Sequence, residues 1–302
     1  MRAAVVVLVL LLAACSSAPP PPEGVNDRKN QAADFLKSGL AAFRAAQYTQ
    51  ALQYYQLALD LDTAVDHVAG MAAAWNSVAT AQTALGRLAD AKASLAQARR
   101  LADDSGDRKV ILQVAVNLIQ ADLAAGDTDR ASRRLEGLKP FPDSAEGAAL
   151  EHAQGTLLRA LGQPIAALAA YDRALALNKR LSLKQDMATN HFMKAAVYDK
   201  LERWPEALIE LQAALDLDRV MENTLGIGID WRSIGTVSLK MGKTDEAFDA
   251  YVRATRLFQA GGLTDQQKRT VQMLLPVTVS LGRADETARY KAMLDKLNST
   301  GP

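Results

Sequence analysis

The sequence is poor in the residues that build disulfides and metal sites. Its 302 residues include one cysteine, so no disulfide can form within the chain. The three histidines, His67, His152 and His191, lie far apart and lack the spacing of metal ligands. We therefore expect a fold that is stable without cross-links, with no metal and no other cofactor.

A charge excess and the common catalytic motifs are also missing. The chain has 35 basic and 34 acidic residues, a formal net charge of +1, whereas a nucleic-acid partner would need a basic surface. No Gly-rich phosphate loop and no G-x-S-x-G motif is found. Asp245 and Glu246 are adjacent at a helix start and point in different directions. We expect neither nucleic-acid binding nor an enzyme, although two carboxylates roughly 5–10 Å apart would favour a glycan hydrolase.

The N-terminus carries the only long apolar run. Arg2 precedes twelve apolar residues, which is short of the about 20 that a membrane-spanning helix needs. A positive charge, a short apolar stretch and a small-residue end are typical of an export signal, which we place at residues 1–14. The alternative is a buried N-terminal helix with an ordinary cysteine.

The end of this signal, Leu12-Ala13-Ala14-Cys15, resembles the lipobox of bacterial lipoproteins. The resemblance implies cleavage before Cys15 and lipidation of that residue, which would anchor the chain in a membrane. Ser16, in place of an aspartate, implies transport to the outer membrane, where the protein would face the periplasm. Residues 15–27 are expected to form the lipid anchor and a proline-rich tether. A proline-rich ligand for a recognition domain is the alternative for this segment.

The rest of the chain is rich in alanine and poor in β-branched residues, which predicts an all-helical fold. Residues 231–257, WRSIGTVSLKMGKTDEAFDAYVRATRL, show the repeated pattern. Small and apolar residues recur at helical spacing from Trp231, Gly242 ends this helix, and Thr244 caps a second one. The second helix has an inner stripe made of Ala247, Tyr251 and Ala254.

This order of residues resembles the tetratricopeptide repeat. Further copies align on a helix-breaking residue, and the last copy is degenerate because Thr287 replaces its first alanine. The breakers lie at positions 46, 86, 126, 162, 202, 242 and 282. The resemblance implies an all-α, right-handed superhelical solenoid of about seven helix pairs with a period near 40 residues. We place it at 28–302, with repeats near residues 32–65, 72–105, 112–145, 148–181, 188–221, 228–261 and 268–301.

The period of 40 departs from the usual 34 and would also fit HEAT or armadillo repeats. The Ala-x3-Tyr-x2-Ala pattern after the breaker favours the tetratricopeptide type. The additional residues predict longer helices or longer turns. One step of 36 falls at residues 138–147, where Pro140 and Pro142 forbid a continuous helix. This segment is expected to be either a hinge or a tight turn.

In the tetratricopeptide family the first helix of each pair lines a concave wall, and the solvent-facing positions of that helix bind partners. Carried over to this sequence, the predicted groove residues are Asn76, Thr80, Gln113, Gln120, His152, Thr156, Arg159, Phe192, Asp199, Arg232, Thr236 and Leu239. A solvated helix face would carry similar residues, so each could also be plain surface.

These features predict a non-catalytic, membrane-anchored scaffold or adaptor that binds envelope proteins or extended peptide segments. Tetratricopeptide lipoproteins of this kind serve in secretion, pilus assembly, exopolysaccharide export and the docking of cell-wall enzymes. The alternative is a small-ligand or glycan receptor, for which Phe192 is the one plausible aromatic wall residue. Self-association is also possible, because residues 271–297 combine an apolar helix with a charged one that would act as a cap.

Overall fold

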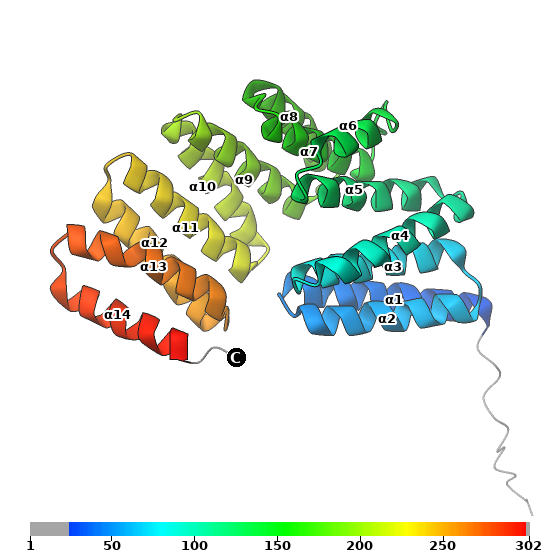
Figure 1. The fold of residues 1–302 in the computed structure, drawn as a ribbon, viewed down its shortest axis with the longest axis horizontal. Coiled ribbons are helices and arrows are strands. Elements are labelled where there is room, and N and C mark those ends of the chain that lie inside the picture. Colours follow the sequence, from blue (N-terminus) through cyan, green and yellow to red (C-terminus); the bar gives the residue numbers. More distant parts are fainter. Residues whose placement is uncertain (1–23, 300–302) are drawn as a thin grey trace, which may run out of the picture.

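The computed structural model describes residues 24–299 as fourteen α-helices without a strand (Figure 1). The all-α solenoid of seven helix pairs is therefore confirmed. The helices are α1 (Val25–Arg44), α2 (Tyr48–Ala64), α3 (Val68–Ala84), α4 (Leu88–Ser105), α5 (Arg108–Ala124), α6 (Thr128–Glu136), α7 (Ala145–Ala160), α8 (Pro164–Arg180), α9 (Lys184–Lys200), α10 (Trp204–Val220), α11 (Thr224–Lys240), α12 (Thr244–Ala260), α13 (Thr264–Ser280) and α14 (Ala284–Ser299).

Long helices and short turns explain the period of 40 residues. Most helices have 17 residues, and three residues separate most successive helices; two residues separate α4 from α5, and eight separate α6 from α7. The first helix of most pairs begins four residues before the range expected from the shorter consensus, as α11 does at Thr224. At the N-terminus α1 begins at Val25, so the solenoid includes the last residues assigned to the tether.

The turns within pairs and between pairs share one conformation. A residue with positive φ occurs every 20 residues, except for one step of 36 from Gly126 to Gly162. The next residue usually donates its N–H to the carbonyl five positions earlier, as Lys243 N does to Ser238 O at 2.9 Å. These left-handed residues are Ala46, Asp66, Gly86, Gly106, Gly126, Gly162, Ser182, Glu202, Glu222, Gly242, Gly262 and Gly282. The geometric unit is thus one helix plus one turn, and the helix breakers aligned in the sequence mark only the turns within pairs.

Glycine and tyrosine set the distance between the two helices of a pair. A Cβ added to Gly155 would lie 2.6 Å from the Tyr171 ring, and one added to Gly235 would lie 2.9 Å from the Tyr251 ring. The first helix can therefore approach closely only because glycine has no side chain. In another pair the same two positions, 16 residues apart, are filled by Ala195 and Leu211, which are both buried.

The third pair is irregular because its second helix is truncated. α6 has nine residues, and residues 137–144 form a loop before α7 begins. Leu138 and Phe141 of this loop pack against the core between α5 and α7, and Asp143 forms an ion pair with Arg180. The short step in the repeat is thus a packed loop of eight residues rather than a tight turn, and its core contacts argue against a free hinge.

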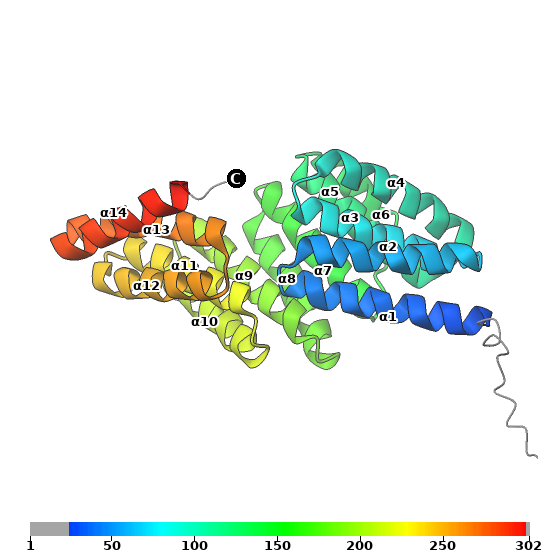
Figure 2. The same cartoon turned by 90° about the horizontal axis from the view of Figure 1, so that it is seen from below.

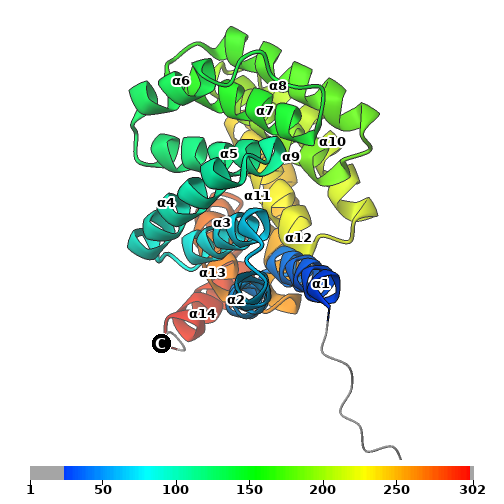
Figure 3. The same cartoon turned by 90° about the vertical axis from the view of Figure 1, so that its right-hand side faces the viewer.

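The pairs stack into a curved array, with α1 and α14 near opposite ends of the arch in Figure 1 and the side view in Figure 2. Odd-numbered helices of neighbouring pairs contact each other from α1 to α9, whereas successive even-numbered helices in the described chain make no comparable contact. In Figure 3, α4, α6, α8 and α10 lie at the periphery, and α3, α9 and α11 lie nearer the middle. The odd-numbered helices therefore form the concave wall.

Two expectations concern residues outside the part of the chain that the structure describes. Cys15 and the signal segment 1–14 both precede Gly24, the first described residue. None of the helices among residues 24–299 is long and apolar enough to cross a membrane.

Candidate functional site

The predicted groove residues lie on the first helices of five pairs. Asn76 and Thr80 belong to α3, Gln113 and Gln120 to α5, and His152, Thr156 and Arg159 to α7. The other five are Phe192 and Asp199 on α9 and Arg232, Thr236 and Leu239 on α11. All are at least partly exposed, so none of them is a core residue.

Several of these side chains link neighbouring repeats instead of facing solvent freely. Asn117 Nδ2 of α5 donates to Asn76 Oδ1 at 2.9 Å and to Thr80 Oγ1 at 3.2 Å on α3. Gln113 of α5 donates to Glu146 Oε1 of α7 at 3.1 Å. These hydrogen bonds fix the register between first helices, so the residues contribute to the shape of the wall.

The same linkage continues at the C-terminal end of the wall. Arg232 Nη1 of α11 donates to Gln266 Oε1 of α13 at 2.6 Å. Lys240 Nζ of α11 donates to both carboxylate oxygens of Asp199 on α9, at 2.7 and 2.6 Å. The partner Lys240 was missed in the sequence because contacts between repeats depend on how the repeats stack, which a single repeat consensus does not specify.

The hydroxyl groups of two threonines and the Nε atom of Arg159 are turned toward the protein and not toward solvent. Thr156 and Thr236 each contact the hydroxyl of the tyrosine in their own pair, Tyr171 at 3.2 Å and Tyr251 at 3.1 Å. The Nε atom of Arg159 is buried and has no hydrogen-bond partner in the described part of the chain. Leu239 differs from these residues because 41% of it is exposed, which leaves an apolar side chain on the wall.

A polar hollow of about 200 Å³ opens between α5, α7 and α9. Its floor includes three alanines of α7, and its polar lining comes from Gln120, His152, Asn178, Asp186, Thr189 and Asn190. Asn178 of α8 is only 2% exposed, and its Oδ1 has no hydrogen-bond partner among the described residues. A buried acceptor without a partner is uncommon, and this oxygen has no donor within the described part of the chain.

The hydrogen bonds around His152 define its tautomer. Asn190 Nδ2 donates to the backbone carbonyl of Asp186 at 2.9 Å, which turns Asn190 Oδ1 toward His152 Nδ1 at 2.8 Å. The proton of the neutral ring is therefore on Nδ1, and Nε2 keeps a lone pair. Burial lowers the pKa of His152, which favours this neutral form.

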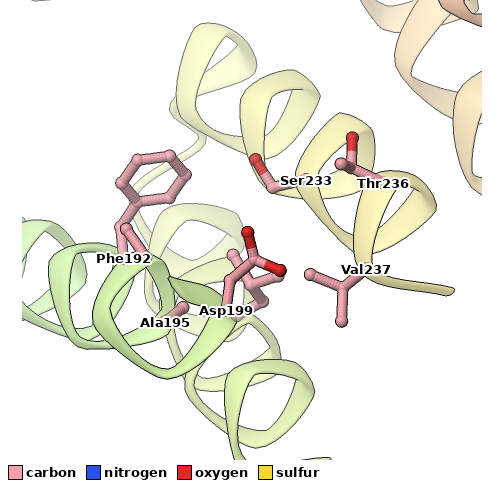
Figure 4. Close-up of a pocket in the computed structure, with 8 residues that line it drawn as sticks. Phe192, Ala195, Asp199, Ser233, Thr236 and Val237 are labelled. Carbon is pink, nitrogen blue, oxygen red and sulfur yellow. The ribbon is translucent and has the colours of Figure 1, made fainter. Parts of the chain in front are cut away.

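A second hollow of about 140 Å³ lies between α9 and α11 and is largely apolar (Figure 4). Phe192 and Asp199 of α9 and Ser233 and Thr236 of α11 surround it, with Ala195, Ala196, Leu211 and Val237 as its apolar lining. Figure 4 shows the Phe192 ring and the Asp199 carboxylate beside the hollow, across from α11. Together the two hollows contain five of the twelve predicted groove residues.

The structure also contains a pair of carboxyl groups that sequence reasoning missed. Asp218 of α10 and Asp230 of α11 are 5% and 2% exposed and share a hydrogen bond. Burial and the neighbouring Asp218 raise the pKa of Asp230 to about 8, so this group is protonated at neutral pH. Because both groups are closed off from solvent, the pair cannot meet a substrate. Asp245 and Glu246, as predicted from the sequence, diverge: they pair with Arg283 and Lys243.

The described residues contain no group of three or more His, Cys, Asp or Glu side chains that could hold a metal ion.

Comparison with known proteins shows the fold and no family. No protein-family model and no curated protein matches the sequence. Several solved structures are similar in fold. The apo quorum sensor NprR from B. thuringiensis has a TM-score of 0.62 at 17% identity, and the match covers 89% of this chain and 77% of that chain. A Rap protein complexed with Competence and Sporulation Factor has a TM-score of 0.60 at 15% identity, covering 90% and 77%.

A third similar structure is a signal transduction ATPase with a tetratricopeptide repeat sensor from Pyrococcus horikoshii, with a TM-score of 0.62 at 10% identity. That match covers 91% of this chain and 47% of the other. At these identities the likeness shows a fold of the tetratricopeptide type.

Proposed function

We propose that this protein is a non-catalytic scaffold whose concave wall binds an extended peptide segment of another protein. The observation that carries the proposal is the pair of hollows on the two sides of α9, because they place a polar and an apolar subsite on one continuous surface. Wall residues that are hydrogen-bonded between repeats keep this surface preformed, which lowers the entropy cost of binding.

We further propose that the scaffold is lipid-anchored through Cys15 to the outer membrane and faces the periplasm, where its partners are envelope proteins. The lipobox-like sequence and Ser16 support this location. The similar Rap structure, which holds Competence and Sporulation Factor, supports the idea that a solenoid of this shape can accommodate such a molecule. Secretion, pilus assembly, polysaccharide export and cell-wall enzyme docking are the candidate processes.

A glycan receptor is less well supported by the wall. Sugar rings are commonly held against aromatic side chains, and Phe192 is the single Phe, Tyr or Trp residue lining the two hollows. The peptide hypothesis also uses the amides and hydroxyls of the polar hollow, which can bond to a peptide backbone.

Photo-crosslinking in living cells tests the peptide hypothesis. A photoreactive amino acid would replace the exposed wall residues Gln120, Thr189 and Leu239, which avoids the wall positions that are hydrogen-bonded between repeats. Matched controls are the exposed residues Arg133 of α6 and Asp249 of α12, on the second helices of their pairs. Discrete protein adducts from the wall sites alone are expected. Adducts from the control sites alone would contradict binding on the concave wall.

The membrane anchor is tested separately by a Cys15→Ser variant. We expect the wild-type chain in the outer-membrane fraction and the variant in the soluble periplasmic fraction or as uncleaved precursor. Metabolic labelling with a palmitate analogue would check for the lipid directly. Equal membrane association and no label in the wild-type chain would contradict the anchor while leaving the wall hypothesis intact.

A further inference from the structure

Three side chains that carry hydrogen-bond acceptors, from three different helices, line the polar hollow. They are Asn178 on α8, His152 on α7 and Asp186 on α9. Asn178 is buried and without a partner for Oδ1, so at least one of these acceptors needs a donor that the described chain does not supply.

The carboxylate gives the hollow its charge. Asp186 is exposed on the wall and forms no salt bridge with any residue in the described range. Burial raises the pKa of Asp186, and Arg44 at the end of α1 acts on it electrostatically in the opposite direction, while Arg159 acts electrostatically on His152. Neither cation lines the hollow, so the negative charge of Asp186 is available to a ligand.

We propose that this hollow binds a protonated primary amine of the peptide segment on the wall, either a lysine side chain or a free N-terminus. An ammonium group has three donors and no acceptor, which suits a hollow lined by three acceptor-bearing side chains and one negative charge. The hollow of about 200 Å³ has room for such a compact group and its aliphatic stem. This inference rests on the peptide-binding function proposed above.

The second hollow would bind an apolar side chain of the same peptide, at a fixed distance from the amine. The α9 residues that line the polar hollow have a mean position near residue 188, and those that line the apolar hollow have a mean position near residue 196. Eight helical residues span about 12 Å, and the hollows lie on opposite sides of α9, about one helix spacing apart. The resulting separation of roughly 15 Å equals four to five residues of extended chain. The ligand is therefore a segment with an amine and, four or five residues away, an apolar side chain.

Selection from a library of random 12-residue peptides with free N-termini, displayed on phage, tests this against the full chain purified in detergent. We expect the selected peptides to carry lysine, or to use their N-terminus, four or five positions from Leu, Met, Val or Phe. The best synthetic peptide is then measured by fluorescence anisotropy, with the amine free or acetylated. Acetylation should weaken binding by about tenfold or more, because charge-assisted hydrogen bonds are lost.

Three variants test whether the preference for a free amine arises in the polar hollow. Asp186→Asn should weaken the free-amine peptide about tenfold and leave the acetylated peptide unchanged. Ala145→Leu, at an exposed lining position, should block the polar hollow. The matched control Ala169→Leu, at an exposed position on α8 outside both hollows, should bind like the wild-type chain. Circular dichroism of each variant checks that the fold is retained.

The outcomes separate this inference from the function on which it rests. Peptides that bind the wall without needing an amine, and equally well after Asp186→Asn, would overturn the inference and keep the scaffold. If no peptide is selected, calorimetry with cadaverine decides the ligand source. Cadaverine binding that Asp186→Asn abolishes would support the amine site but overturn the peptide source. If neither a peptide nor cadaverine binds, the inference is overturned.

Discussion

Packing at single residues determines how closely the two helices of a pair can approach. Gly155 lies directly under the Tyr171 ring, and both residues are buried. Ala195 and Leu211 occupy the equivalent positions of the next pair, so the chain contains two solutions to the same spacing. A methyl group on the first helix is compatible with leucine on the second helix, but it is too close to a tyrosine ring.

We therefore expect Gly155→Ala to destabilise the protein by about 1–3 kcal/mol, as for other overpacked cores. Adding Tyr171→Leu should recover part of this loss, because the double variant copies the arrangement of Ala195 and Leu211. Urea unfolding followed by circular dichroism measures both changes. A Gly155→Ala variant as stable as the wild-type chain, or a double variant that is simply worse, would contradict this explanation.

The buried carboxyl pair makes stability depend on pH. The pKa of Asp230 rises to about 8 in the folded state, while the unfolded chain has an ordinary aspartate near 4. The folded state thus binds more protons between these values, and the free energy of unfolding falls as pH rises from about 4 to about 8. Each pH unit in this window costs up to about 1.4 kcal/mol.

An Asp230→Asn variant should lose much of this dependence and be more stable than the wild-type chain at pH 8. Asparagine has the shape of a protonated aspartate, and Asn178 and Asn190 form the equivalent buried positions 40 residues earlier. The measurement is a series of urea unfolding curves at pH 5, 6.5 and 8. If the free energies of unfolding of the two proteins change with pH in the same way, and the variant is less stable at every pH, then Asp230 is not protonated in the folded state.

At the scale of the element, the turns decide where each helix ends. Five turns place a residue other than glycine in the left-handed region, at Ala46, Asp66, Ser182, Glu202 and Glu222. This conformation costs an L-residue roughly 1–2 kcal/mol, whereas glycine adopts it readily. The 20-residue spacing of the helices is thus kept even where the local sequence disfavours the turn.

Glu202→Gly should stabilise the protein by about 0.5–1 kcal/mol, because relief of this strain exceeds the added entropy of glycine in the unfolded chain. Glu202→Ala is the matched control, since it removes the exposed side chain and keeps the strained backbone. Thermal unfolding of the two variants and the wild-type chain is the measurement. If the glycine and alanine variants melt together, the conformation of this turn carries no strain.

At the scale of the whole molecule, the last pair closes the array. α14 packs Tyr290, Met293 and Leu294 on the apolar face of α13. Its far side is mostly exposed, which agrees with the expected solubilising cap. Without α14, the buried residues Val271 and Leu274 would lose their cover.

Removal of residues 284–302 should therefore convert the chain into a self-associating species, because the uncovered face of α13 is apolar. Light scattering after size-exclusion chromatography would report a larger mass for the truncated chain than for the full chain at equal concentration. A truncated chain with the mass of a monomer and the helix content expected for thirteen helices would contradict this role of α14.

Much of the architecture follows from local chemistry that the sequence displays. The spacing of small residues around Tyr251 and the helix breaker Gly242 predicted the helix pairs, because helix periodicity and turn conformation are set within a few residues. The inter-repeat turns were missed where Asp66 and Ser182 stand in them. Their conformation is imposed by packing of the flanking helices, so no turn residue reveals it.

The sequence by itself determined the helical class and the number of pairs, because helix periodicity and helix breakers are local features. Only the tertiary structure decided which of the predicted groove residues bond to the next repeat, which pair of aspartates is buried, and where hollows open beside α9. These features join residues about 10 to 40 positions apart, and their distances depend on how whole helices stack. Side-chain pattern within one helix does not contain that information.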